Sequence, residues 1–263
     1  MAQEKLTFTN DQGEQLAARL DVPEDRTPRG YILFAHCFTG SKDVLAGARI
    51  AKALWLRGFA VMRFDFTGLG ESEGDFANTT FSSNVDDIIA AATYLRDTRQ
   101  APGVLIGHSL GGAAILAAAG NIPEARAVCT IGSPADPEHV AHHFADAREE
   151  IENAGEAEVT IGERPFRIKK SFLDDIAGQK LDHCVANLQK ALLIFHSPVD
   201  QTVGIENAGH IYQAAKHPKS FVSLDKADHM LTSRADAYYV AEVISAWANR
   251  YDEVGSRKER RED

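Results

Sequence analysis

Short, continuous apolar runs alternate with segments of helical periodicity along most of this chain, and that alternation constrains its fold more than any other feature. Runs of this kind, rich in branched and aromatic side chains, are typical of strands buried on both faces of a sheet. Strands that alternate with helices predict right-handed crossovers and a mostly parallel sheet covered by helices on both faces. The predicted strands are 31–36, 59–66, 103–107, 127–131, 191–195 and 220–224, and the predicted helices are 45–57, 85–95, 110–119, 207–215 and 237–251.

The first residues of the chain add a different pattern. Runs of alternating apolar residues at 6–9 and 15–22, joined by a turn at 10–13, predict an antiparallel hairpin at one edge of the sheet. A chain of 263 residues is long enough for one domain with a single large core. The predicted organisation is a core of 1–135 and 189–251, an inserted cap of 136–188, and a charged, disordered tail of 252–263.

Residues 136–188 interrupt the alternation between two predicted strands. The sequence predicts a helix over 138–151, a hairpin of 158–161 and 165–168 around Gly162, and further helix after it. A long insertion with its own secondary structure is typical of a cap over a functional site. This segment holds 12 acidic and 6 basic residues, so it carries much of the net charge of −10. A solvated decoration is the alternative interpretation.

Composition excludes several classes of partner. The net charge of −10 argues against nucleic acid, which needs a basic face, and against a polybasic attachment to a membrane. No apolar stretch approaches the roughly 20 residues that cross a bilayer, and the N-terminus lacks a signal region. Cys37, Cys129 and Cys184 have neither metal-type nor redox-type spacing, which is typical of a reduced protein. We predict a cytoplasmic protein, with a homodimer as one open oligomeric state.

The motif Gly107-His108-Ser109-Leu110-Gly111 stands directly between a predicted strand and a predicted helix. In that context G-x-S-x-G is typical of a nucleophile elbow, where small residues on either side of the serine let the chain turn sharply. Ser109 would project from the carboxyl edge of the sheet, where ligands bind in such folds. The N-terminus of the following helix favours a developing negative charge. We predict that Ser109 is a catalytic nucleophile.

A serine hydroxyl needs a base that takes its proton and an acid that orients the base. His229 follows the last predicted strand on a loop at the same edge, and it comes after every candidate acid, as this architecture requires. Asp200 follows the penultimate strand at that edge, and we predict it as the acid. Asp225 and Asp228 are its rivals, but an acid on the loop of the histidine itself rarely points at the ring.

The loop after the first buried strand, His36-Cys37-Phe38-Thr39-Gly40-Ser41, supplies a second element of such a site. The backbone N–H groups of Phe38 and Leu110 are the predicted oxyanion hole. Cys37 is interpreted as a small filler behind this loop, and a reactive thiol is the alternative.

Two other patterns have structural interpretations. The glycines of 68–74 are misspaced for dinucleotide binding, so we predict a tight loop that Asp65 anchors through hydrogen bonds. His139 and His143 are four residues apart on a predicted helix and could ligate a metal, but such pairs are common on surfaces. We therefore predict no metal.

Several of these motifs resemble the α/β-hydrolase superfamily. The matching segments are 36–40, 63–72, 107–112, 198–200 and 227–229, and the resemblance covers roughly 6–251. The nearest likeness is to intracellular carboxylesterases of the cinnamoyl/feruloyl type, which carry a small inserted cap. The chain is also similar to the hydrolase half of bifunctional proteins that contain an OsmC-like peroxide-detoxifying domain. One departure is Cys37, which stands where the family usually has glycine.

The resemblance implies an eight-stranded sheet, a Ser109-His229-Asp200 triad, and ester chemistry on a small-molecule substrate. We predict a serine carboxylesterase that hydrolyses small to medium carboxylic esters through an acyl-enzyme intermediate and uses no cofactor. A thioesterase, an acyltransferase or a perhydrolase would use the same residues, and a non-catalytic binding module is a further alternative. Apolar side chains of the cap are predicted to line the substrate pocket: Phe144, Phe166, Ile168, Phe172 and Leu173.

Overall fold

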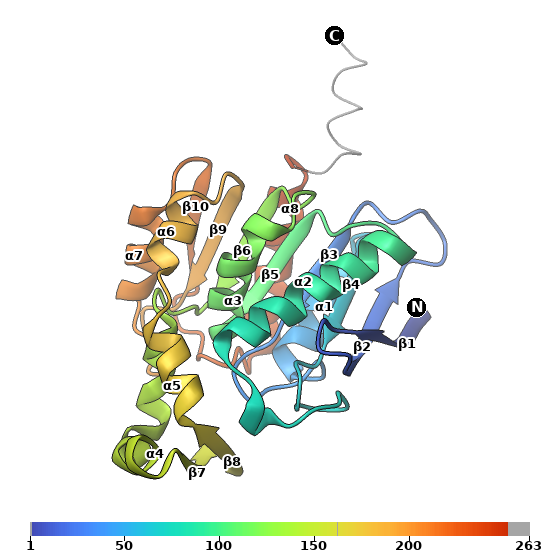
Figure 1. The fold of residues 1–263 in the computed structure, drawn as a ribbon. Helices are drawn as coiled ribbons and strands as arrows, with labels where there is room; N and C mark the ends of the chain where they lie inside the picture. The colour runs from blue at the N-terminus through green and yellow to red at the C-terminus, as the bar shows by residue number, and fades with distance from the viewer. Residues whose placement is uncertain (1, 162, 252–263) are drawn as a thin grey trace.

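The computed structural model describes residues 2–161 and 163–251 (Figure 1). The strands of its main sheet are β1 (Ala2–Thr9), β2 (Gln15–Val22), β3 (Tyr31–Ala35), β4 (Ala60–Phe64), β5 (Val104–His108), β6 (Ala127–Ile131), β9 (Ala191–His196) and β10 (Lys219–Ser223). Their order is β1-β2-β4-β3-β5-β6-β9-β10. β2 is antiparallel to both of its neighbours, and all other neighbouring pairs are parallel. This confirms the prediction of a mostly parallel, eight-stranded sheet. The tail predicted at 252–263 lies outside the described residues.

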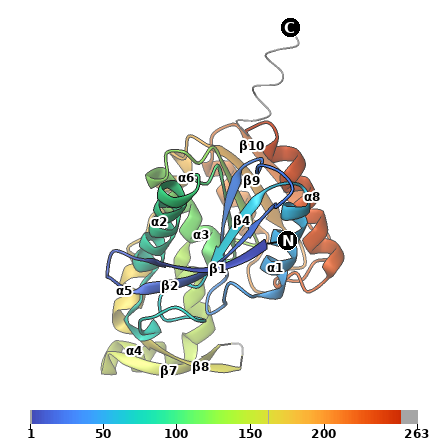
Figure 2. The same ribbon diagram turned by 90° about the vertical axis from the view of Figure 1, so that its right-hand side faces the viewer.

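Helices cover both faces of this sheet (Figure 2). One face carries α1 (Leu45–Leu56) and α8 (Arg234–Ala248), and the other carries α2 (Phe81–Thr98), α3 (Leu110–Ala118), continued by η2 (Ala119–Asn121), and α7 (Glu206–Ala214). Each face buries its own apolar cluster, which explains why the central strands are apolar on both sides. Within the described ranges, no helix combines the length and apolar character that a membrane crossing requires.

Helix α2 begins four residues before its predicted start at Val85. Thr80 is its N-cap, because the Thr80 hydroxyl accepts a hydrogen bond from the Ser83 N–H at 3.1 Å. The Ser83 hydroxyl and the Thr80 N–H close the reciprocal bond at 2.9 Å. The apolar spacing missed this start, but Thr80 and Ser83 have the spacing of a capping box, so the signal was present in the sequence.

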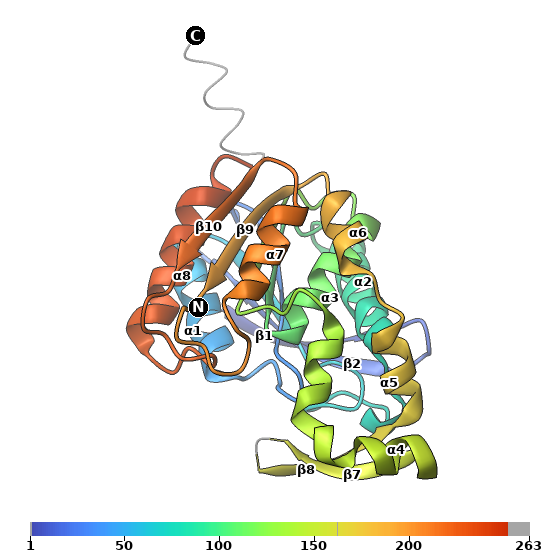
Figure 3. The same ribbon diagram turned by 90° about the vertical axis from the view of Figure 1, so that its left-hand side faces the viewer.

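The elements of the insertion, residues 136–188, are η3 (Pro137–Ala147), α4 (Arg148–Ala154), the antiparallel pair β7 (Glu156–Ile161) and β8 (Arg164–Lys169), α5 (Lys170–Ala177) and α6 (Leu181–Ala186). The insertion extends beyond the carboxyl ends of the strands over α4, β7, β8 and α5, and its last helix, α6, returns alongside α3 and α7 (Figure 3). The prediction that 138–151 is helical is confirmed, but the helix is not continuous, because the backbone breaks at Phe144, with φ −137°. That break places the Phe144 ring against the Phe172 ring, at 6.3 Å between centroids.

Candidate active site

Ser109 lies at the sharp turn between β5 and α3. Its φ of +54° falls in a region that non-glycine residues rarely adopt, and its N–H donates to the Ile131 carbonyl of β6 at 2.9 Å. Two glycines allow the turn. A Cβ on Gly107 would lie 2.3 Å from the Gly111 carbonyl oxygen, and a Cβ on Gly111 would lie 2.2 Å from the His36 carbonyl oxygen. The elbow therefore requires glycine at both flanking positions.

The structure brings Ser109, His229 and Asp200 together from three loops at the carboxyl edge of the sheet. The Ser109 hydroxyl lies 3.0 Å from Nε2 of His229, and Nδ1 of the same ring lies 2.7 Å from Oδ2 of Asp200. The carboxylate only accepts, so His229 donates Nδ1–H to it and Nε2 is left to accept the serine proton. This arrangement can turn a hydroxyl into a nucleophile.

Asp200 is fixed by its own loop. Oδ1 of its carboxylate accepts the N–H groups of Thr202 at 2.8 Å and of Val203 at 2.9 Å. Burial raises the pKa of Asp200, but the hydrogen bonds from His229 and from these backbone groups outweigh it and hold the pKa below its ordinary value. Its carboxylate therefore stays ionised beside the ring.

The rival acids point elsewhere. The Asp225 carboxylate bonds to the Ser223 hydroxyl at 3.1 Å, on the exposed side of its loop. The Asp228 carboxylate accepts from the N–H and the hydroxyl of Thr232. Among the candidate acids, only the Asp200 carboxylate bonds to the His229 ring within the described residues.

Two neighbours support the His229 loop. The Nε2–H of His108 donates to the carbonyl oxygen of His229 at 2.8 Å. Burial, followed by the electrostatic effect of the nearby His229, lowers the pKa of His108 to about 4, so the His108 ring stays neutral at neutral pH. Gly132, with φ +54°, lies beneath the triad, where a Cβ would stand 3.4 Å from both Oδ2 of Asp200 and Nδ1 of His229. Sequence reasoning gave neither residue a place in the site.

The oxyanion loop, residues 36–41, lies beside α3. Among the described residues, neither the Phe38 N–H nor the Leu110 N–H donates to a protein acceptor, so both are free to meet a ligand oxygen. Leu110 begins α3, where the first N–H groups of a helix have no partner inside the helix. Burial raises the pKa of Cys37 to about 11, which keeps it a thiol and favours its interpretation as a filler.

A buried ion pair joins this loop to the glycine-rich loop that follows β4. Asp65 accepts from the Lys42 N–H at 2.5 Å, from the Lys42 ammonium at 2.6 Å and from the Glu71 N–H at 2.9 Å. A Cβ on Gly70 would lie 2.2 Å from the Asp65 carboxylate, so glycine is needed there for close approach. Asp65 thus anchors both loops.

The five predicted pocket residues of the insertion are buried. Their side chains belong to the apolar cluster that also contains α2 and α3: Phe144, Phe166, Ile168, Phe172 and Leu173. Phe172 reaches the oxyanion loop, since its ring centroid lies 5.5 Å from that of Phe38. Phe166 contacts that loop only through Phe76, which lies 5.0 Å from Phe166 and 5.7 Å from Phe38 between ring centroids. Contact with a substrate stays a prediction for all five.

The first segment of the insertion also approaches the triad. Burial lowers the pKa of His143, and the nearby rings of His139 and His229 lower it further. Nε2 of His139 lies 2.8 Å from the carbonyl oxygen of Thr202, on the Asp200 loop. In the portions of the chain that the structure describes, no group of three His, Cys, Asp or Glu side chains is arranged to hold a metal ion.

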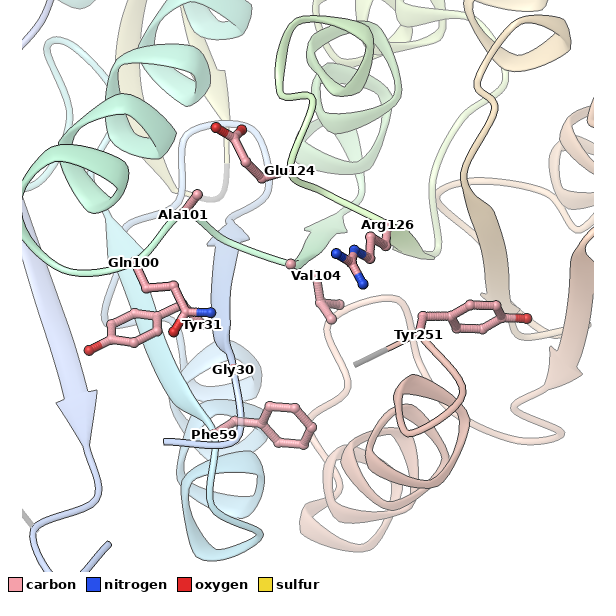
Figure 4. A pocket seen from close by; sticks show the side chains of 10 residues that line it. Gly30, Tyr31, Phe59, Gln100, Ala101, Val104, Glu124, Arg126 and Tyr251 are labelled. Carbon is pink, nitrogen blue, oxygen red and sulfur yellow. The ribbon is translucent and has the colours of Figure 1, made fainter. Parts of the chain in front are cut away.

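A hollow of about 160 Å³ opens at the opposite edge of the sheet (Figure 4). It lies at the amino ends of β3 and β5, among Tyr31, Phe59, Val104 and Tyr251. Ser109 follows the carboxyl end of β5. This hollow is therefore separate from the candidate active site.

Comparison with known proteins agrees with the fold. Residues 26–136 match the family described as serine aminopeptidase, S33. The solved esterase domain from a Rhodothermus marinus protein is 50% identical, with a TM-score of 0.78 over 95% of this chain and 99% of that one. The chain belongs to the α/β-hydrolase family, and its mostly parallel eight-stranded sheet agrees with this.

Two further relatives are more distant. The mitochondrial palmitoyl-protein thioesterase ABHD10 of Mus musculus is 29% identical over 188 residues, a match that covers 69% of this chain and 62% of that protein. The structure of Est1E from Butyrivibrio proteoclasticus with bound ferulic acid is 21% identical, with a TM-score of 0.77 over 94% of this chain and 98% of that one. This second likeness concerns the fold alone.

Proposed function

We propose that the chain is a serine carboxylesterase that hydrolyses small to medium carboxylic esters through an acyl-enzyme intermediate. One observation carries the proposal: the His229 ring bridges Ser109 at 3.0 Å and Asp200 at 2.7 Å in an otherwise buried setting. A serine, a neutral imidazole and an ionised acid in that order are the parts that acyl transfer requires.

In the proposed reaction each of these groups has a role. The Ser109 hydroxyl attacks the ester carbonyl while its proton passes to Nε2 of His229, and the new oxyanion accepts bonds from the Phe38 and Leu110 N–H groups. The tetrahedral intermediate collapses when Nε2–H of His229 protonates the leaving alkoxide. Water then loses a proton to His229 and attacks the acyl-enzyme, which releases the acid and restores the Ser109 hydroxyl.

Thioester hydrolysis is a second candidate, because the mouse relative is named a palmitoyl-protein thioesterase. The same triad would serve, since only the leaving atom changes from oxygen to sulfur. A substrate series separates the candidates: p-nitrophenyl esters from acetate to palmitate, methyl ferulate, and the acyl thioesters of the same chain lengths. We expect the highest kcat/KM on short and medium oxygen esters, whereas a thioesterase would prefer the thioesters.

The decisive variant is Ser109→Ala, with Ser245→Ala, a buried serine on the distant helix α8, as its control. We expect Ser109→Ala to lower kcat on p-nitrophenyl butyrate by about 10⁶-fold, because the triad acts as a unit. A fluorophosphonate probe should label the native chain and Ser245→Ala but not Ser109→Ala. Full turnover by Ser109→Ala would refute the proposal.

A further inference from the structure

The oxyanion loop holds a residue in an uncommon conformation. Residues 37–40 form a turn that the Gly40 N–H closes on the Cys37 carbonyl at 3.0 Å. Thr39 has φ +57° at the third position of this turn, where glycine is usual and a β-branched side chain is disfavoured. A residue of this kind keeps its conformation only where its surroundings impose it. The Phe38 N–H precedes Thr39 in the same turn, so its direction depends on those surroundings.

The insertion supplies part of the surroundings of the turn formed by residues 37–40. The Phe38 ring lies between Phe76, at 5.7 Å, and Phe172 of α5, at 5.5 Å between centroids. The Thr39 carbonyl oxygen accepts a hydrogen bond from Nη1 of Arg164, the first residue of β8, at 3.3 Å. The insertion thus contacts the turn twice, once through an apolar ring and once through a polar bond.

The insertion is itself fixed to the scaffold on this side. The Lys169 ammonium donates to Oδ1 of Asn78 at 2.6 Å, in the segment that follows β4. Asp175 of α5 accepts from both the N–H and the hydroxyl of Ser82, at 2.8 and 2.6 Å, in the first turn of α2. Phe172 and Arg164 therefore reach the turn from a docked support.

We infer that the insertion orients the oxyanion donor, with Phe172 and Arg164 as positioning residues that act through the Phe38 N–H. The inference rests on the proposed function, which assigns that N–H to the developing oxyanion. The bond between the N–H and the oxyanion reaches full strength only in the tetrahedral intermediate, so misalignment lowers kcat and leaves substrate binding unchanged. A side chain that only lines the pocket would change KM instead.

The variants are Phe172→Leu, which keeps apolar bulk but removes the ring, and Arg164→Gln, which removes the guanidinium. Arg167→Gln is the matched control, because Arg167 lies on the same strand and is exposed, and its ion pair with Glu156 stays inside the insertion at 3.5 Å. Arg164 is exposed, so its replacement tests the inference even if Phe172→Leu fails to fold.

Two measurements separate positioning from binding. Steady-state kinetics on p-nitrophenyl butyrate gives kcat and KM. Inhibition by a trifluoromethyl ketone reports the oxyanion, because its carbonyl carbon bonds to the Ser109 oxygen, the serine proton passes to His229, and the ketone oxygen becomes negative. The methyl ketone of the same chain length stays a carbonyl and reports ground-state binding.

We expect Phe172→Leu and Arg164→Gln each to lower kcat by about 3- to 10-fold and to weaken the trifluoromethyl ketone by the same factor. In Arg164→Gln, KM and the methyl ketone affinity should not change, and Arg167→Gln should behave as the native chain. In Phe172→Leu, whose ring is also a predicted pocket residue, kcat should fall by a larger factor than KM rises. A rise in KM at constant kcat, or an equal loss in Arg167→Gln, would overturn the inference. Failure of the proposed function looks different, because the native chain itself would then show neither turnover nor tight ketone inhibition.

Discussion

The loops that carry the triad and the insertion beside them are held by different kinds of contact. Backbone hydrogen bonds continue the sheet ladder into the triad loops: the Ser109 N–H donates to Ile131 and the Leu224 N–H to His196, both at 2.9 Å. Glycines let those loops pass close to one another. The insertion, in contrast, meets the scaffold through aromatic rings and a few long side chains. The positions of the triad residues therefore depend on backbone hydrogen bonds and glycines, whereas the position of the insertion depends on side-chain contacts.

After Ser109→Ala, the largest expected effect concerns Asp200, on one of the loops that backbone hydrogen bonds hold in place. Asp200→Asn keeps the shape of the side chain but removes the charge that orients the His229 ring, so we expect kcat to fall by about 10⁴-fold. The measurement is single-substrate kinetics on p-nitrophenyl butyrate.

Asp225→Asn is the control for that variant, because among the described residues its carboxylate bonds to the nearby Ser223 hydroxyl and not to the triad. We expect native kinetics from it. If the two variants lost activity equally, the loss would not come from the contact between Asp200 and His229. A general effect of removing one negative charge would then explain it.

The sequence predicted the triad loops better than it predicted the contacts of the insertion. Ser109, Asp200 and His229 each follow a strand of a parallel sheet by one to a few residues, so finding the strands placed their loops at one edge. Their roles as a triad stay a prediction until the variants are measured.

The insertion was harder to predict for a physical reason. Phe172 and Phe38 are 134 positions apart, and periodicity indicates only that a face is apolar, not which ring it will meet. The break at Phe144 likewise depends on the tertiary cluster that its ring enters. The Lys42 partner of Asp65 had no local signal either, because the two residues belong to different loops.

A second expected effect concerns the stability of the fold in acid, and it again tests the region around the triad loops. Burial lowers the pKa of His36 and of His108 to about 4, whereas an unfolded histidine has a pKa of about 6.5. Below pH 6.5 the unfolded chain takes up protons that the folded chain does not, so stability falls between pH 6.5 and pH 4. From pH 7 to pH 5 we expect a loss of about 2 kcal/mol in unfolding free energy for each ring.

Urea unfolding at pH 7 and pH 5 measures this loss. In His108→Gln, which keeps an N–H donor but does not titrate, the loss between the two pH values should shrink by about 2 kcal/mol. His210→Gln, at an exposed ring, is the control and should show the native loss. An identical loss in His108→Gln and the native chain would remove the buried ring beside His229 as the origin.

The smallest expected effect tests how the insertion is attached. The Asp175 carboxylate accepts the Ser82 N–H at the N-terminus of α2, where a negative charge and a missing hydrogen-bond partner both favour it. Asp175→Ala should lower the unfolding free energy by about 1 kcal/mol. Asp174→Ala is the matched control, because the neighbouring carboxylate is exposed and pairs only with Lys170, four residues away, at 2.7 Å.

We expect Asp174→Ala to cost about 0.3 kcal/mol, as for other exposed pairs at that spacing. If the two variants lose the same amount of stability, the bond to Ser82 adds nothing, and the aromatic contacts and the remaining polar bonds, such as that from Lys169 to Asn78, hold the insertion to the scaffold. If Asp175→Ala loses more, a hydrogen bond to a backbone N–H also fixes the insertion, and the contrast between the two regions becomes one of degree. In that case Asp175→Ala should also lower kcat and change KM by a smaller factor, because α5 carries Phe172, which contacts the oxyanion loop.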